Sequence, residues 1–193
     1  MNLKTLLGMT RDFLDLRSDD VVEQFIGGVD WNMNQRNLVP VENAKTRYLE
    51  QCIPHAGPNE SRMVRAVIDA APELNWFLSY DDDTFGGGVT DKLLAVELAG
   101  PQGHFMNDNL RLGFYLQYPG VAYPNHWHEA EEIYIPLTNG TLWSRDNGEF
   151  ITRNSGDIIH HVSNEAHAMT TNDAPLLALW AWRGANLQLK FEY

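Results

Sequence analysis

The stretch GVAYPNHWHEAEEIY (residues 120–134) decides the fold, because it sets metal-binding residue types at even spacing along an aromatic-rich segment. His126 and His128 are two residues apart, and Glu132 follows four residues later. Residues i and i+2 of a β-strand lie on the same face, so these three side chains can point to one side of a sheet. Imidazole and carboxylate together suit divalent transition metals rather than calcium. The stretch therefore predicts part of a metal site on β-strands.

Short runs of β-branched and aromatic residues recur from about Lys92 onward, separated by turn signals such as PQG, YPG and TNG. Strands at this spacing predict an all-β sandwich or a closed barrel. The runs are LLAVEL (93–98), LGFYLQY (112–118), EEIYIPL (131–137), GTLWSR (140–145), LLALWAW (176–182) and LQLKFEY (187–193).

The first 80 residues have a helical pattern instead. Apolar residues recur there at the spacing of one helix face, which predicts packing faces. They are Leu3, Leu6, Leu7, Phe13 and Leu14 in a first stripe, and Met63, Val64, Val67, Ile68 and Ala71 in a later one. We therefore expect an N-terminal helical extension over residues 1–85 and a metal-binding β-barrel domain over residues 90–193.

The composition disfavours several classes of partner. The 193 residues include 26 acidic and 14 basic ones, a formal net charge of -12. Such a surface repels nucleic-acid phosphates and anionic lipid, and no apolar run approaches the roughly 18 residues of a membrane span. The first residues lack a secretory signal pattern, and the one cysteine, Cys52, cannot form an intramolecular disulfide. We expect a cytoplasmic monomer or homodimer with no nucleic-acid or membrane partner.

A barrel site needs a further ligand from another strand, and three downstream histidines offer one: His160, His161 and His167. The spacing from Gly120 to Glu132 resembles the first motif of the cupin family, although the next glycine, Gly140, comes one residue late. Gly156-Asp157 with a histidine eleven residues after the glycine resembles the second motif. The resemblance implies a mainly β cupin barrel of the jelly-roll type, preceded here by an α-helical segment. It also implies four ligands for one divalent transition metal, zinc, iron(II) or manganese: His126, His128, Glu132 and His167.

The register of the strand that leads into the second motif predicts the positions of the other two histidines. We expect His160 in the wall of the pocket and His161 at the surface.

Two tyrosines lie near the predicted ligands. Tyr123 precedes His126 by three residues, and Tyr134 follows Glu132 by two on the same strand face. A nearby divalent cation stabilises a phenolate, so either tyrosine is a candidate to take a proton from carbon beside a metal-bound carboxylate. Tyrosine is also a common barrel-filling residue, which is the competing interpretation.

Aromatic residues are dense in the predicted barrel. An aromatic wall can hold an alkylated cation by cation–π attraction, worth around 2 kcal/mol or more when desolvated. Aromatic side chains of this kind are more often core, however. The residues we assign to such a wall are Tyr115, Trp127, Trp180 and Trp182.

The segment YPNHWHEAEEIY, the helical leader and the chain length together resemble the cupin-type dimethylsulfoniopropionate (DMSP) lyases of marine bacteria, particularly the Q-type. The resemblance implies β-elimination of DMSP, a zwitterionic sulfonium, to dimethyl sulfide and acrylate, with the substrate carboxylate on the metal. It implies Tyr134 as the catalytic base, with Tyr123 assisting or competing, and Trp182 in the substrate pocket. The substrate-binding set that we predict is Trp182, Trp180, Trp127, Tyr115 and His160.

Two other interpretations stay open. The same ligands serve other metal-dependent cupin enzymes on small carboxylate substrates, such as iron dioxygenases and isomerases. A non-catalytic sensor or storage barrel is the third interpretation. It is disfavoured because the helical leader has no basic recognition helix.

Overall fold

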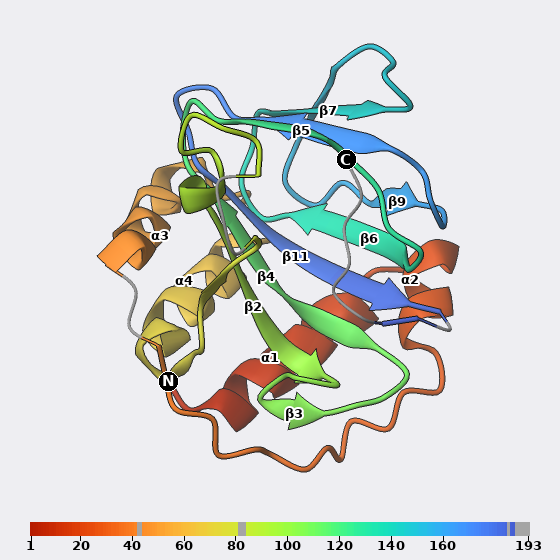
Figure 1. Ribbon diagram of the computed structural model, residues 1–193. Coiled ribbons are helices and arrows are strands. Elements are labelled where there is room, and N and C mark those ends of the chain that lie inside the picture. Colours follow the sequence, from red (N-terminus) through yellow and green to blue (C-terminus); the bar gives the residue numbers. More distant parts are fainter. Residues whose placement is uncertain (42–43, 81–83, 185, 188–193) are drawn as a thin grey trace.

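The computed structural model describes residues 1–41, 44–80, 84–184 and 186–187, and Figure 1 shows its arrangement. Two β-sheets form the body of the molecule, and helices lie against the larger one (Figure 1). Within the described residues, no helix is long and apolar enough to cross a membrane.

The larger sheet has the strand order β1-β2-β4-β11-β6-β9, with β3 paired to β2. All of its pairs are antiparallel except that of β2 with β3. Its strands are β1 (Phe77–Leu78), β2 (Leu93–Gly100), β3 (Phe105–Met106), β4 (Arg111–Gln117), β6 (Glu131–Pro136), β9 (Ile159–His161) and β11 (Leu176–Arg183).

The smaller sheet has the order β5-β10-β7-β8 and is antiparallel throughout. Its strands are β5 (Ala122–His126), β7 (Thr141–Arg145), β8 (Ile151–Arg153) and β10 (His167–Thr170). Five of the six strand predictions are confirmed by β2, β4, β6, β7 and β11. The sixth, LQLKFEY, lies outside the described residues except for Leu187.

Helices occupy the first part of the chain, as the apolar stripes predict. α1 begins after Asn2, whose side chain accepts a hydrogen bond from the Thr5 backbone N–H, and α2 is capped in the same way by Asp19. The α-helices are α1 (Leu3–Asp15), α2 (Asp20–Ile26), α3 (Tyr48–Gln51) and α4 (Ser61–Ala70). Short 3₁₀ helices lie at Ala44–Arg47, Ile53–His55, Ala71–Glu73 and Thr90–Lys92.

Every residue of β2 and β4 is buried, so both faces of the larger sheet are covered there. Apolar residues of α1 and α4 belong to the same core cluster as these strands and cover the outer face. The opposite face of the larger sheet lines the interior of the barrel. β1 joins this sheet through Phe77 and Leu78, so the chain before residue 85 also contributes to it.

A buried ion pair ties β4 to β2 at one end of the larger sheet. The Arg111 guanidinium donates to the Glu97 carboxylate from Nε at 2.9 Å and also from Nη2, and both side chains are at most 3% exposed. Arg111 also donates to the Leu187 carbonyl at 2.8 Å, which holds the chain after β11. Its guanidinium lies 5.7 Å from the ring centroid of Trp182.

Arg111→Ala should destabilise the fold by about 3–5 kcal/mol, because it leaves the Glu97 carboxylate buried without its counter-charge. The free energy of unfolding in urea measures this. Arg11→Ala is the matched control: its pair with Asp12 is exposed, so its loss should leave the free energy of unfolding nearly unchanged. Equal losses for the two variants would contradict a structural role for the buried pair.

Candidate metal centre and adjoining cavity

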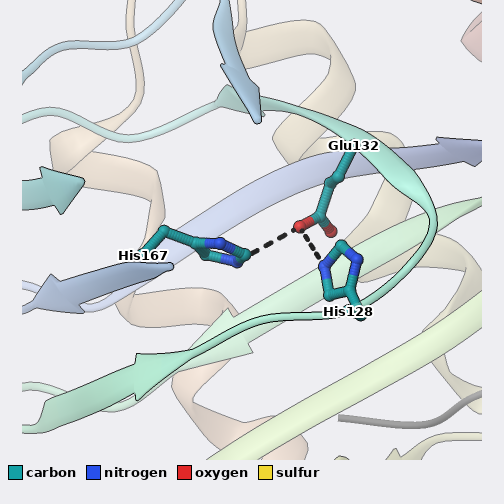
Figure 2. Close-up of side chains that lie close together, drawn as sticks. All are labelled: His128, Glu132 and His167. Carbon is teal, nitrogen blue, oxygen red and sulfur yellow. Dashed lines mark hydrogen bonds and ion pairs between the residues drawn. The ribbon is translucent and has the colours of Figure 1, made fainter. Parts of the chain in front are cut away.

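The predicted ligands converge where the two sheets meet. His126 is the last residue of β5 and His167 is the first of β10, and their Cα atoms are paired in the smaller sheet. Glu132 lies on β6 in the larger sheet. His128 lies in the loop between β5 and β6. The ligand atoms of His128, Glu132 and His167 all lie within 4.8 Å of one another, and all three residues are buried. Figure 2 shows the two imidazoles directed at the carboxylate from two sides.

Backbone carbonyls orient the imidazoles. The Nδ1 atoms of His126, His128 and His167 lie 3.0, 2.8 and 2.9 Å from backbone carbonyl oxygens. An Nδ1–H that donates to a carbonyl leaves the Nε2 lone pair for a metal, the usual support of histidine ligands. The Nε2 atoms of His128 and His167 are 3.0 and 3.4 Å from Glu132 Oε2. This buried donor set fits a divalent transition metal.

His126 lies beside this group rather than within it. Its ring centroid is 4.2 Å from that of His167, with the rings at 64°. Its nitrogens do not meet the 4.8 Å spacing that the other three ligands share. Ligation by His126 therefore stays a prediction.

The structure reverses the predicted positions of His160 and His161. The Cα atom of His161 is paired with that of Glu132, so His161 faces the site; it is 1% exposed and its ring stacks on His167 at 4.0 Å. His160 faces out of the barrel, where Nε2 lies 2.6 Å from a carboxylate oxygen of Glu131 and the ring contacts Phe25 edge-on. The prediction was wrong by one residue of register, which exchanges the two faces of a strand.

Trp182 holds Glu132 in place. Its indole Nε1–H donates to Glu132 Oε1 at 2.6 Å, and the two residues are Cα partners across β11 and β6. The indole ring also packs against the His128 ring at a centroid distance of 4.2 Å. The sequence predicted Trp182 as part of an aromatic wall. The structure adds that its indole N–H is already hydrogen-bonded to Glu132.

A cavity adjoins the metal centre at Glu132. It is mostly aromatic, and three of its residues come from β1, the segment after it and β2, for which the motifs gave no signal. Its lining is Phe77, Ser79, Ala95, Tyr115, Tyr123, Glu132, Tyr134, Trp180 and Trp182.

Two predicted wall residues are not part of this lining as far as the described residues go: Trp127 and His160. Trp127 lies between His126 and His128, so strand alternation directs it to the opposite face, where it is partly exposed. His160 faces outward for the reason of register given above.

The two candidate tyrosines lie on the cavity wall together with Tyr115. The Tyr123 hydroxyl lies 2.5 Å from that of Tyr80, and its ring stacks on His126 at 4.0 Å. The Glu132 carboxylate lies close enough to Tyr134 to raise the pKa of its hydroxyl. Tyr80 was not singled out by the sequence, because it lies outside both motifs.

A sequence profile described as dimethylsulfoniopropionate lyase matches residues 18–178 of this chain. The chain belongs to the DMSP lyase family. It is 33% identical over 119 residues to the DMSP lyase DddQ of Ruegeria pomeroyi, a match that covers 62% of this chain and 59% of that protein. It is 31% identical over 129 residues to a putative DMSP lyase, DddL, of Cereibacter sphaeroides, covering 66% and 53%. The matched part is thus a little over half the length of these relatives.

Crystal structures of two members of the DMSP lyase family have the same fold. The DddQ structure from Ruegeria pomeroyi superposes with a TM-score of 0.87 at 25% identity, covering 98% of this chain and 94% of that one. A chain from the crystal structures of the DMSP lyases RdDddP and RnDddQII superposes with a TM-score of 0.86 at 28% identity, covering 98% and 96%. The predicted cupin barrel with its helical leader is confirmed.

Burial and neighbouring side chains set the protonation states of His126 and Glu132 in this member of the DMSP lyase family. Burial lowers the pKa of His126 well below its usual value, with a contribution from His167, so its imidazole stays neutral. Burial alone would raise the pKa of Glu132, but the contacts with His128 and His167 outweigh it and the pKa is lowered. Neutral imidazole and ionised carboxylate are the forms that bind metals.

The pKa values of both cavity tyrosines are raised well above 10, mainly by burial. Tyr80 adds to this at Tyr123, and the Glu132 carboxylate adds to it at Tyr134. A divalent cation in the adjoining site would oppose both shifts, because positive charge favours the phenolate.

The stability of the metal-free protein should fall in acid. Burial, helped by His167, lowers the pKa of His161 to about 2, so below about pH 6.5 the unfolded chain binds a proton that the folded chain does not. The free energy of unfolding therefore falls as pH falls, by about 2 kcal/mol at pH 5 for this group. Urea unfolding at pH 7.5 and pH 5 should show that His161→Phe loses less stability than the wild type. An equal loss would contradict a neutral buried His161.

His167→Ala should lower the affinity for zinc by more than about 100-fold, beyond the 10–100-fold that loss of a supporting partner gives. Competition with a chromophoric chelator measures the affinity. His160→Ala is the matched control and should bind zinc as the wild type does, because its side chain faces away from the centre. His126→Ala tests the remaining ligand: unchanged affinity would remove His126 from the set.

Proposed function

We propose that this protein is a metal-dependent lyase that cleaves DMSP by β-elimination to dimethyl sulfide and acrylate. The observation that carries the proposal is the meeting of a buried histidine–glutamate group with two tyrosine hydroxyls at one aromatic cavity. Membership of the DMSP lyase family supports the same activity. A zwitterion with an alkylated cation at one end and a carboxylate at the other suits such a cavity.

The proposed cofactor is one zinc, iron(II) or manganese ion. When bound, it would act as a Lewis acid that holds the substrate carboxylate and stabilises negative charge on that carboxylate and on a nearby phenolate. The chain's own part is to present neutral, oriented imidazoles and a charged carboxylate in a buried site. The residues proposed to hold the ion are His126, His128, Glu132 and His167.

Tyr134 is proposed as the catalytic base. It lines the cavity together with Glu132, two residues away on the same face of β6. As phenolate, it takes the proton from the substrate carbon next to the carboxylate. The electrons of that C–H bond form the carbon–carbon double bond, and the pair of the Cβ–S bond leaves with sulfur as neutral dimethyl sulfide. Acrylate remains, and the proton ends on Tyr134.

Tyr123 is proposed to assist. It lines the same cavity, but its hydroxyl is paired with Tyr80 and its ring is stacked on His126. These contacts suit a residue that shapes the pocket and passes a proton between its own hydroxyl and that of Tyr80. The sulfonium end of the substrate would lie against the aromatic wall, where ring faces attract a desolvated cation.

A headspace assay for dimethyl sulfide tests the proposal directly. Protein loaded separately with zinc, iron(II) and manganese is given DMSP, and gas release together with acrylate is measured. Release with at least one metal, and none after chelation, is the expected result. Silence with all three metals would refute the lyase assignment, and oxygen consumption by the iron-loaded protein would favour a dioxygenase instead.

Tyr134→Phe should lower kcat by about 10²–10⁴-fold, the usual contribution of a positioned base, with zinc affinity unchanged. Tyr123→Phe, which removes the other cavity hydroxyl, should have a smaller effect on kcat. Gas release and chelator competition measure the two quantities on the same samples. If both variants keep full activity, proton abstraction by tyrosine is wrong even though the lyase assignment stands.

A further inference from the structure

The polar groups on the cavity wall are nearly all engaged within the protein. The Tyr115 hydroxyl donates to Gln117 Oε1 at 3.0 Å, and the Tyr123 hydroxyl is paired with that of Tyr80. The Trp182 indole N–H donates to Glu132. Ser79 is partly exposed, and its hydroxyl can rotate toward water.

Trp180 is the exception. It is 4% exposed and lines the cavity, yet its indole Nε1–H has no hydrogen-bond acceptor among the described residues. Trp180 and Trp182 lie two residues apart on β11, and only the N–H of Trp182 is used by the protein. A buried donor without an acceptor costs free energy, so such groups in native proteins call for an explanation. The nitrogen itself has almost no accessible surface, so an acceptor in the adjoining cavity reaches it once the side chains around it shift slightly.

We propose that the Trp180 indole N–H is a carboxylate-binding donor, which holds one carboxylate oxygen of the ligand in the cavity. This deepens and rests on the proposed function, because it assigns the direction in which the substrate lies. A sulfonium has no lone pair that accepts a strong hydrogen bond, so the donor selects the carboxylate end. Hydrogen bonds to a charged acceptor are the stronger class.

The position of Trp180 agrees with the proposed chemistry. Its Cα atom is paired with that of Tyr134 across β11 and β6, so the two side chains are neighbours on the inner face. The carbon that loses its proton is bonded directly to the carboxylate carbon. A carboxylate held at Trp180 therefore brings that carbon close to Tyr134. A carboxylate at the opposite end of the cavity would instead place the sulfonium beside Tyr134.

The inference is tested by binding, without turnover. The zinc-loaded protein is titrated with acrylate, and the indole N–H resonances of its six tryptophans are followed by ¹H–¹⁵N NMR. The resonance that is missing in Trp180→Phe should move downfield as acrylate binds. Trimethylsulfonium, a cation without a carboxylate, is the control ligand and should not move it downfield.

Affinity gives the second readout. Trp180→Phe keeps an aromatic ring and loses only the donor, so the dissociation constant for acrylate should rise about tenfold, equivalent to about 1.4 kcal/mol. Trp143→Phe is the matched control: the Trp143 indole N–H is also buried without an acceptor among the described residues, but Trp143 does not line the cavity. Its acrylate affinity should equal that of the wild type. Trp180→Leu, which also lacks a donor, serves the same purpose if the phenylalanine variant does not fold.

The outcomes separate this inference from the lyase assignment. An unmoved Trp180 resonance, or equal acrylate affinity in Trp180→Phe and the wild type, overturns the carboxylate donor whether or not dimethyl sulfide is released. A downfield shift and a tenfold loss support the donor even if DMSP is not cleaved. In that case the cavity binds another carboxylate, and only the proposed reaction fails.

Discussion

The buried carboxylate of Glu132 is the constraint on which the site depends. An ionised group that is 1% exposed is very costly unless it is paired and hydrogen-bonded. The indole N–H of Trp182 donates to one carboxylate oxygen, and the Nε2 atoms of His128 and His167 lie 3.0 and 3.4 Å from the other, where a bound divalent cation would balance its charge. These three residues come from other parts of the barrel or the loop before β6. The carboxylate thereby joins the two sheets at one point.

The same requirement explains how the cavity and the metal centre adjoin. Trp182 donates its N–H to Glu132 and also lines the cavity, so one residue belongs both to the metal centre and to the cavity wall. The ion pair of Arg111 and Glu97 lies behind Trp182 and keeps the end of β11 in place. A mostly aromatic cavity with a few polar groups on its wall suits a small ligand.

Several parts of the site were outside the reach of the sequence. Phe77 and Ser79 precede the barrel motifs and reach the cavity only because β1 pairs with β2. His160 and His161 are adjacent, and which of them faces inward depends on the pairing of β9 with β6, which one residue of slip would reverse. Trp180 and Trp182 share a strand face, yet only the neighbouring strand decides which N–H has an acceptor.

The sequence by itself determined the barrel, the helical leader and the candidate ligands, because alternation along a strand and the two spaced motifs depend only on local geometry. The resemblance to the two cupin motifs implied that His128, Glu132 and His167 lie together, as the structure has them. Only the tertiary structure decided that His161 stacks behind His167, that His160 faces away from the cavity, and that Trp182 supports Glu132. These contacts join strands far apart in the chain, and strand register, which no single segment encodes, sets them.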